Sequence, residues 1–414
     1  MTSGLQHFFS QSVFNVFGNA TASFLAFLFN YVVVHALTQA DYGEYASVNA
    51  YVTLLVLPLT VLALIITRSL ARRAPARRWR ALQRLNTRTL ATLRHFLPAV
   101  LAGAVIAVFV LAWRANFLSQ FSAPLVIFLL AANCLVTWWN SELVGLQWFR
   151  STAAAAIASM GFRLLTGLAV LLWTPTLMGV YGCLVVSALV QCAWYYLTLS
   201  GCFRRKLTST ASLPAWSLTH LPKQAWLPSF LFTLTTTCLL NLDVVAVKCW
   251  CTPDFAGLYG LFSLFAKVLL YASQPLINVA FTHFGSSSVV HARQVATFAS
   301  FFIIAFTLGM TALYAFLPGL LITIVGHASY LSLAPDLFLA AIFGGVYSLV
   351  MLWGQKLVAA SSHWLAWGLL APLAQLALFA VSPAQIRTLA VIDIAVTAAL
   401  LIFWRLAARK ASRA

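Results

Sequence analysis

Twelve long apolar stretches constrain the fold of this chain more than any other feature. The composition agrees with them, because 62% of the residues are hydrophobic and only 8% are charged. A run of about 20 apolar residues can cross the hydrocarbon core of a bilayer as a helix, in which every backbone polar group is satisfied internally. The sequence therefore predicts an all-α integral membrane protein with twelve transmembrane helices, at residues 12–37, 45–67, 96–113, 121–147, 151–173, 177–199, 226–249, 257–282, 296–318, 332–355, 362–381 and 387–406.

The Lys and Arg residues are distributed unevenly between the predicted loops. With a cytoplasmic N-terminus, 20 of the 25 fall on the cytoplasmic side, nine of them in the loop 68–95, and only Arg114 and Arg387 fall outside. This asymmetry places both termini in the cytoplasm. The net charge of +18 therefore reports membrane orientation, and nucleic acid is not an expected partner. Several arginines of the loop 68–95 share one helical face, so we expect this loop to lie on an anionic leaflet, with membrane lipids as partners.

The two halves of the chain repeat a short pattern. Gly43-x-Tyr45 at the start of the second span matches Gly257-x-Tyr259 at the start of the eighth, at an offset of 214 residues. Six spans per half preserve orientation, so the repeats should be related by a pseudo-two-fold axis along the membrane normal. We expect two six-helix lobes, 1–205 and 226–414, joined by a cytoplasmic linker at 206–225, with a central cavity between them. That architecture is typical of secondary transporters.

Polar residues inside the spans are the candidates for lining this cavity, because each is costly in the membrane unless it faces protein or water. The eighth span carries a polar stripe at three- and four-residue spacing, made of Ser263, Lys267, Tyr271, Gln274 and Asn278. Further polar residues lie along the first and second spans and include Asn15, Asn19 and Asn49. These residues are the predicted substrate-binding set. Interhelical hydrogen bonding is the alternative explanation for all of them.

Four charged residues inside the spans refine the site. Lys267 lies about 15 Å into its helix, too deep to reach the interface easily, so we expect it to be a substrate-facing cation. Arg163 either contacts substrate or forms a buried structural pair with Glu142. Asp243 either pairs with Lys267 or Lys248 or carries a proton, while Lys248 is expected to reach the interface. Asp243 and Glu142 are therefore the candidates for ion coupling or ion pairing.

Several motifs resemble the multidrug/oligosaccharidyl-lipid/polysaccharide (MOP) exporter superfamily. They are the Gly-x-Tyr pairs, Asn241-Leu242-Asp243, the segment from Pro253 to Tyr259, Gly145-Leu146-Gln147-Trp148-Phe149 and Leu320-Leu321-Ile322-Thr323-Ile324-Val325-Gly326. The length and number of spans resemble its polysaccharide-transporter branch, the Wzx-type O-antigen flippases. The resemblance implies a two-lobed, V-shaped alternating-access transporter and not an enzyme. Its implied substrate is a polyprenyl-diphosphate-linked oligosaccharide, flipped to the outer leaflet of the bacterial inner membrane for surface polysaccharide synthesis.

The resemblance also bears on cofactors and partners. It implies no cofactor beyond proton or sodium coupling, and it allows a polysaccharide polymerase complex as a partner of a monomeric transporter. We expect no catalytic residues, no metal ligands and no direct ATP use, because the chain has no phosphate-binding Gly-Lys-Ser/Thr loop. An ion-coupled multidrug exporter of the same superfamily and a membrane polysaccharide polymerase or ligase are the alternatives. The short external loops argue against the second, and seven carboxylates in all argue against the first.

Overall fold

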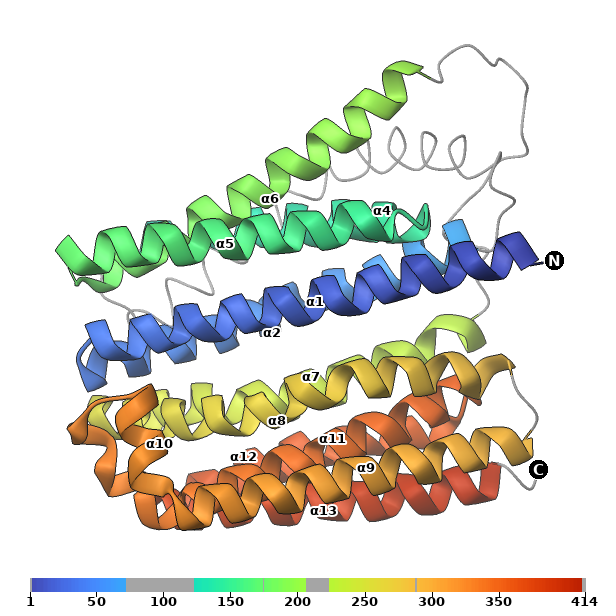
Figure 1. Cartoon of the computed structure of the whole chain (residues 1–414). Coiled ribbons are helices and arrows are strands. Elements are labelled where there is room, and N and C mark those ends of the chain that lie inside the picture. Colours follow the sequence, from blue (N-terminus) through green and yellow to red (C-terminus); the bar gives the residue numbers. More distant parts are fainter. Residues whose placement is uncertain (1, 72–122, 174, 206–222, 287–288, 412–414) are drawn as a thin grey trace. The chain divides into compact units, whose positions relative to one another are not determined.

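The computed structural model describes residues 2–71, 123–173, 175–205, 223–286 and 289–411 (Figure 1). These residues form long helices joined by short connections. Eleven helical segments among them are long and apolar enough to cross a membrane. The predicted all-α membrane architecture is confirmed, with its spans displaced by a few residues at their ends. The third predicted span, 96–113, and most of the basic loop 68–95 lie outside the described residues.

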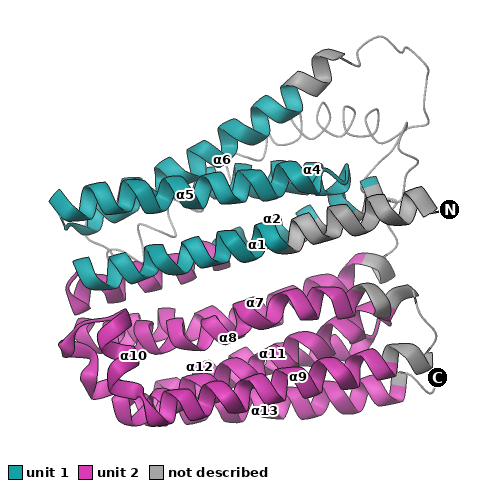
Figure 2. Ribbon diagram, in the orientation of Figure 1, with its two compact units in different colours: residues 1–36, 55–222 teal, residues 37–54, 223–414 magenta. Residues whose placement is uncertain are grey.

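The helices group into two compact units (Figure 2). Unit 1 consists of residues 1–36 and 55–222, and unit 2 consists of residues 37–54 and 223–414. The division falls inside one helix, α2 (Gln39–Ala71), whose first half belongs to unit 2 and whose second half belongs to unit 1. The predicted lobes, 1–205 and 226–414, do not divide this helix.

Unit 1 is a bundle packed around α5 and α6. Its helices besides the second half of α2 are α1 (Thr2–Ala36), α4 (Ala123–Gly145), α5 (Phe149–Trp173) and α6 (Leu177–Arg205). Helix α1 packs along α5, and α6 packs against both α4 and α5. Ile66, Leu70, Trp138, Leu143 and Tyr195 form its buried core at one end. The hydroxyl of Tyr195 donates to Asn140 Oδ1 at 3.1 Å, so this buried phenol has the partner it needs.

Unit 2 is built around one central helix, α11 (Leu337–Ala359), which packs against α7, α8, α9 and α13. Its other elements are α7 (Lys223–Trp250), α8 (Pro253–Ser286), α9 (Val289–Phe316), α10 (Pro318–Val325), η2 (Ala328–Asp336), η3 (His363–Leu369), α12 (Leu370–Val381) and α13 (Ile386–Ala411). Phe232, Leu270, Val350, Leu400 and Trp404 lie in its main core. The tenth and eleventh predicted spans each begin with a 3₁₀ segment, η2 and η3, and the short helix α10 was not predicted.

The two glycines that the repeat identified meet where α2 crosses α8. A Cβ atom on Gly43 would lie 2.6 Å from the backbone nitrogen of Gly257. A Cβ on Gly257 would lie 2.0 Å from the carbonyl oxygen of Gln39, so only glycine allows this approach. The side chain of Gln39 also donates to the carbonyl of Asp254 at 2.7 Å. Residues matched by the 214-residue offset are thus in direct contact within unit 2.

Candidate functional site

A buried polar cluster lies in the interior of unit 2 and joins four of its helices. Tyr259 of α8 places its hydroxyl 2.9 Å from Asp243 Oδ2 of α7 and 2.5 Å from Asp393 Oδ2 of α13. Gln375 of α12 donates its amide to Asp393 Oδ1 at 2.7 Å and to the carbonyl of Leu239 at 3.2 Å. All four side chains are fully buried. We call Asp243, Tyr259, Gln375 and Asp393 the carboxylate cluster.

The carboxylate cluster has too few hydrogens for its close contacts. The Tyr259 hydroxyl carries one hydrogen but faces two carboxylate oxygens. If both carboxylates were ionised, one of these contacts would bring together two lone pairs. The geometry is satisfied when one carboxyl group holds a proton and donates it, or when a cation lies among the oxygens.

Oxygen atoms around the carboxylate cluster are available as acceptors. Among the residues that the structure describes, Asp243 Oδ1, Gln375 Oε1 and Thr397 Oγ1 are buried without a hydrogen-bond partner. The two amide hydrogens of Gln375 are both directed at acceptors, which fixes its Oε1 as the free atom. Thr397 lies one turn beyond Asp393 on α13. Oxygen ligands of this kind suit a small hard cation, and they equally suit a proton held between carboxyl groups.

Lys267 supplies one positive charge close to the carboxylate cluster. It lies on α8, is half-buried, and interacts electrostatically with Asp243. This is one of the two partners the sequence suggested for Asp243. Two buried carboxylates and one lysine leave one negative charge uncompensated, which is costly inside a membrane. One monovalent cation bound among these groups would neutralise the remaining negative charge.

The later part of the predicted stripe on α8, residues 271–278, turns away from the core of unit 2. Tyr271 and Asn278 are exposed and Gln274 is half-buried, while Ser263 at the other end is buried. Gln274 donates its amide to Asn278 Oδ1 at 2.9 Å, so these two residues are brought together. The stripe therefore presents its amides and phenol on an uncovered helix face, with Lys267 between that face and the buried cluster.

In unit 1, Arg163 and Glu142 occupy different levels of the bundle. Arg163 of α5 donates its Nε to the Ser187 hydroxyl of α6 at 3.1 Å, and its guanidinium lies over the Phe29 ring at 5.5 Å. Glu142 is fully buried, three residues before the end of α4. Arg163 lies 14 residues into α5, about 21 Å from the start of that helix. The predicted pairing of these two residues stays untested.

The remaining predicted polar residues belong to α1 and α2. Asn19 is exposed on α1 and Asn49 is half-buried on α2, whereas the side chain of Asn15 lies outside the described residues. Two further asparagines, Asn30 on α1 and Asn241 on α7, bond to their own helices. Asn30 donates to the carbonyl of Ala26 at 2.8 Å, and Asn241 donates to that of Thr237 at 2.9 Å. Each of these contacts lies one turn back in the same helix.

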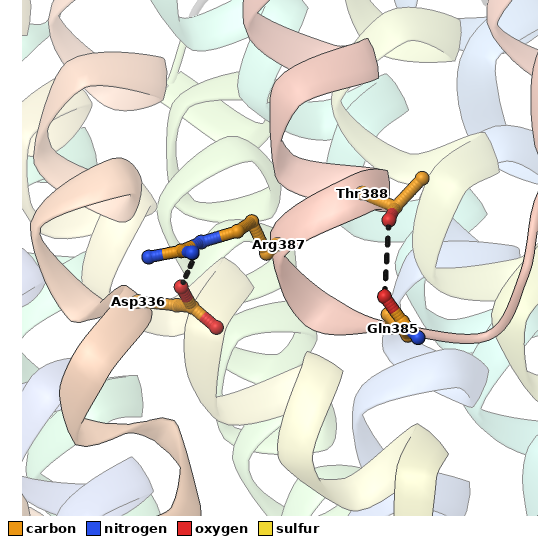
Figure 3. A network of polar contacts seen from close by, with 4 residues as sticks. All are labelled: Asp336, Gln385, Arg387 and Thr388. Atoms are coloured by element: carbon orange, nitrogen blue, oxygen red, sulfur yellow. Dashed lines mark hydrogen bonds and ion pairs between the residues drawn. The ribbon is translucent and has the colours of Figure 1, made fainter.

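Two charges near the ends of helices in unit 2 have structural partners. Lys248 was expected to reach the interface; its side chain is buried and interacts electrostatically with Glu44 and Asp41 at the start of α2. Arg387 at the start of α13 donates its Nε to Asp336 Oδ1 at 2.9 Å, and Thr388 lies beside it, bonded to Gln385 (Figure 3). Because Arg387 is largely exposed, this pair contributes little to stability.

Sequence reasoning missed three members of the carboxylate cluster and its neighbour Thr397. Asp393 was detectable, since it is a carboxylate in the middle of the last predicted span and the chain has only seven acidic residues. Tyr259 was noticed only as part of a repeat. Gln375 was also detectable, since it is the one polar side chain of α12. Thr397 carried no distinguishing signal.

Solved structures similar to this one are transporters. No protein-family model matches the chain, and no curated protein is similar to it in sequence. An outward-facing multidrug resistance MATE family transporter of the MOP superfamily matches with a TM-score of 0.70 at 13% identity, over 97% of this chain and 95% of that one. A MOP superfamily transporter from Pyrococcus furiosus matches at 0.65 and 13%, over 97% and 94%.

A eukaryotic MATE transporter, AtDTX14, matches with a TM-score of 0.61 at 12% identity, over 97% of this chain and 96% of that one. The likeness covers nearly the whole length of each chain, and at such low identity it establishes architecture alone. The chain has the fold of the MATE transporters of the MOP superfamily.

Proposed function

We propose that this protein is an alternating-access transporter of a polyprenyl-diphosphate-linked oligosaccharide. It would flip this lipid from the cytoplasmic to the outer leaflet of a bacterial inner membrane, with both of its own termini in the cytoplasm. The fold shared with known transporters supports the transport class. The distribution of charge within the spans supports an anionic substrate.

The charged side chains in the middle of the spans that are partly exposed are cations, and the charged side chains that are fully buried there are carboxylates. This observation is the main support for the proposal. Glu142, Asp243 and Asp393 are each 0% exposed, whereas Lys267 and Arg163 are half-buried. The other acidic residues lie at or near helix ends and are Asp41, Glu44, Asp254 and Asp336. A diphosphate therefore finds cations for charge-assisted hydrogen bonds. An organic cation finds no accessible carboxylate at mid-membrane depth.

The exposed face of α8 suits the sugar portion of such a substrate. Gln274, Asn278 and Tyr271 offer amides and a phenol that hydrogen-bond to hydroxyl groups, beside Lys267 for the diphosphate. The membrane potential would assist export, since moving two negative charges outward across 100 mV gains roughly 4 to 5 kcal/mol if they cross the whole field.

A multidrug exporter is the second candidate, because similar solved structures include a multidrug resistance transporter. A reversed polarity of the binding pocket has been taken to suggest a different function for the Pyrococcus furiosus transporter of the same superfamily. Within this fold, the sign of the accessible charge is therefore a reasonable guide to substrate.

Binding to the purified protein in detergent tests the proposal. We expect a short-chain polyprenyl diphosphate carrying an oligosaccharide to bind, and Lys267→Gln to weaken it about tenfold or more through loss of a charge-assisted contact. Lys410→Gln removes the same charge from an exposed position near the end of α13 and should leave affinity unchanged. Preferential binding of a lipophilic cation such as ethidium, insensitive to Lys267→Gln, would favour the multidrug exporter.

We further propose that the carboxylate cluster binds the coupling ion, a proton or Na⁺. The uncompensated charge and the unpaired oxygens support this assignment. Asp243→Asn and Asp393→Asn each remove one negative charge at nearly constant volume, so they should abolish dependence of transport on the ion gradient. Release of protons on adding Na⁺ to the detergent-solubilised protein distinguishes the two ions. Unchanged ion dependence in both variants would contradict the assignment.

A further inference from the structure

Two cations from two helices lie over one indole ring in unit 2, and a third cation lies near one of them. Lys356 Nζ lies 5.1 Å from the centroid of Trp353, and the guanidinium of Arg405 lies 5.8 Å from the same centroid. Arg293 is close enough to Lys356 to repel it electrostatically. These residues come from α9, α11 and α13, and we call Arg293, Trp353, Lys356 and Arg405 the basic-aromatic cluster.

No carboxylate balances this charge. All seven acidic residues of the chain are described, and none lies on α9 or α11. The only acid on α13, Asp393, is 12 residues from Arg405, which is about 18 Å along the helix. Lys356 and Arg405 are each stabilised to some extent by the indole face. Their mutual repulsion nevertheless leaves a site that an external anion would stabilise.

The surroundings of the cluster are those of a bilayer interface. Lys356 lies three residues before the end of α11, and Arg293 is the fifth residue of α9. Arg293 and Arg405 are exposed, and Trp353 is half-buried, as is common for tryptophans at headgroup level. Beside Arg405, Ile402 and Leu406 are 60% and 52% exposed, so apolar side chains flank the charge. A free phosphate ion would make no use of them, but acyl chains would.

We propose that the basic-aromatic cluster is a docking site for one anionic phospholipid of the cytoplasmic leaflet. The headgroup phosphate lies between Lys356 and Arg405, with Arg293 adding attraction and Trp353 holding the two cations in place. The acyl chains run along the α13 face that carries Ile402. Basic pockets between helix ends on the cytoplasmic side suit such headgroups.

The chain supplies a matched control for this site. Lys410 Nζ lies 5.7 Å from the centroid of Trp364, so the pair repeats the lysine–indole contact near the same end of α13. Trp364 packs against Phe403, and among the described residues Lys410 is the cation that lies over its ring. Loss of Lys410 therefore removes a positive charge without opening the three-cation cluster.

Lipid binding in zwitterionic detergent micelles tests the site. We expect fluorescent phosphatidylglycerol to bind the wild-type protein, and the double substitution Lys356→Gln with Arg405→Gln to weaken binding about 30-fold, or about 2 kcal/mol for two charges. Lys410→Gln should change the affinity by less than about twofold, and the charge-retaining pair Lys356→Arg with Arg405→Lys should restore binding. Helical circular dichroism verifies that each variant is folded.

Three results would overturn the proposal, two of them in the binding assay and one in a competition with phosphate. The first is unchanged phosphatidylglycerol affinity in the double variant, and the second is equal wild-type affinity for phosphatidylcholine. If the double variant does not fold, the single change Arg405→Gln at its exposed position decides the matter, with an expected loss of about fivefold. Displacement of the lipid by millimolar inorganic phosphate would also contradict it, because the acyl chains would then contribute nothing.

Discussion

The crossing of α2 and α8 gives the sharpest stability prediction, through the substitution Gly257→Ala. The added methyl group would lie 2.0 Å from the carbonyl oxygen of Gln39 and 2.8 Å from its carbonyl carbon. Carbon–oxygen contacts are normally about 3.3 Å or longer, so the two backbones must separate by about 1 Å. Because the obstacle is backbone and not the tip of a flexible side chain, a rotamer change does not relieve it.

The magnitude follows from three terms. Overpacking of this kind costs about 1–3 kcal/mol. Separation of the helices also weakens the hydrogen bond from Gln39 to the carbonyl of Asp254, worth about 1 kcal/mol. Replacing glycine by alanine within a helix returns about 1 kcal/mol. We therefore expect Gly257→Ala to lower the free energy of unfolding by about 1–3 kcal/mol.

Gly309→Ala on α9 is the matched control, because no heavy atom lies within 4 Å of a Cβ at that position. It should leave stability unchanged or raise it by up to about 1 kcal/mol. Unfolding of both variants in mixed micelles of increasing sodium dodecyl sulfate content, followed by helical circular dichroism, gives the comparison. If Gly257→Ala is as stable as Gly309→Ala, the contact between α2 and α8 is not as close as described.

Three further outcomes test other parts of the molecule. Trp404→Ala removes a fully buried ring that lies 6.0 Å from Phe232, so it should cost about 3–5 kcal/mol in the same unfolding assay. Arg387→Ala should lower the free energy of unfolding by less than about 1 kcal/mol, because the Arg387 side chain that binds Asp336 is mostly exposed. A larger loss would mean that the pair is structurally important. Lys267→Ala should abolish transport while the protein still inserts and elutes as a folded species, and near-normal transport would remove Lys267 from the site.

The architecture was predictable because hydrophobic length and loop charge act over whole segments. Eleven of the twelve spans have counterparts among the described helices, and Gly43 and Gly257 were identified from the repeat before their contact was known. Helix α10 and the 3₁₀ starts of two spans were not predicted. Pro318 begins α10 and Pro335 lies inside η2, and hydropathy does not say how the chain resumes after a proline.

The candidate site was only partly predictable, because a polar pattern on one helix does not identify what faces it. Lys267 and Asp243 were chosen as intramembrane charges and do interact. The other members of the carboxylate cluster come from α8, α12 and α13, up to 150 residues away from Asp243, and packing alone decides which of many polar side chains meet. The position of Lys248 at a helix end likewise gave no indication of the acidic residues on α2 with which it interacts.

Leaflet exchange in proteoliposomes tests the central claim most directly. The purified protein is reconstituted with a fluorescent polyprenyl-diphosphate oligosaccharide, and its accessibility to a membrane-impermeant quencher is followed with and without an inside-negative potential. The account predicts exchange that the potential accelerates outward and that Lys267→Ala abolishes. Absence of exchange across several oligosaccharides and ion gradients, together with transport of organic cations by the same proteoliposomes, would contradict it.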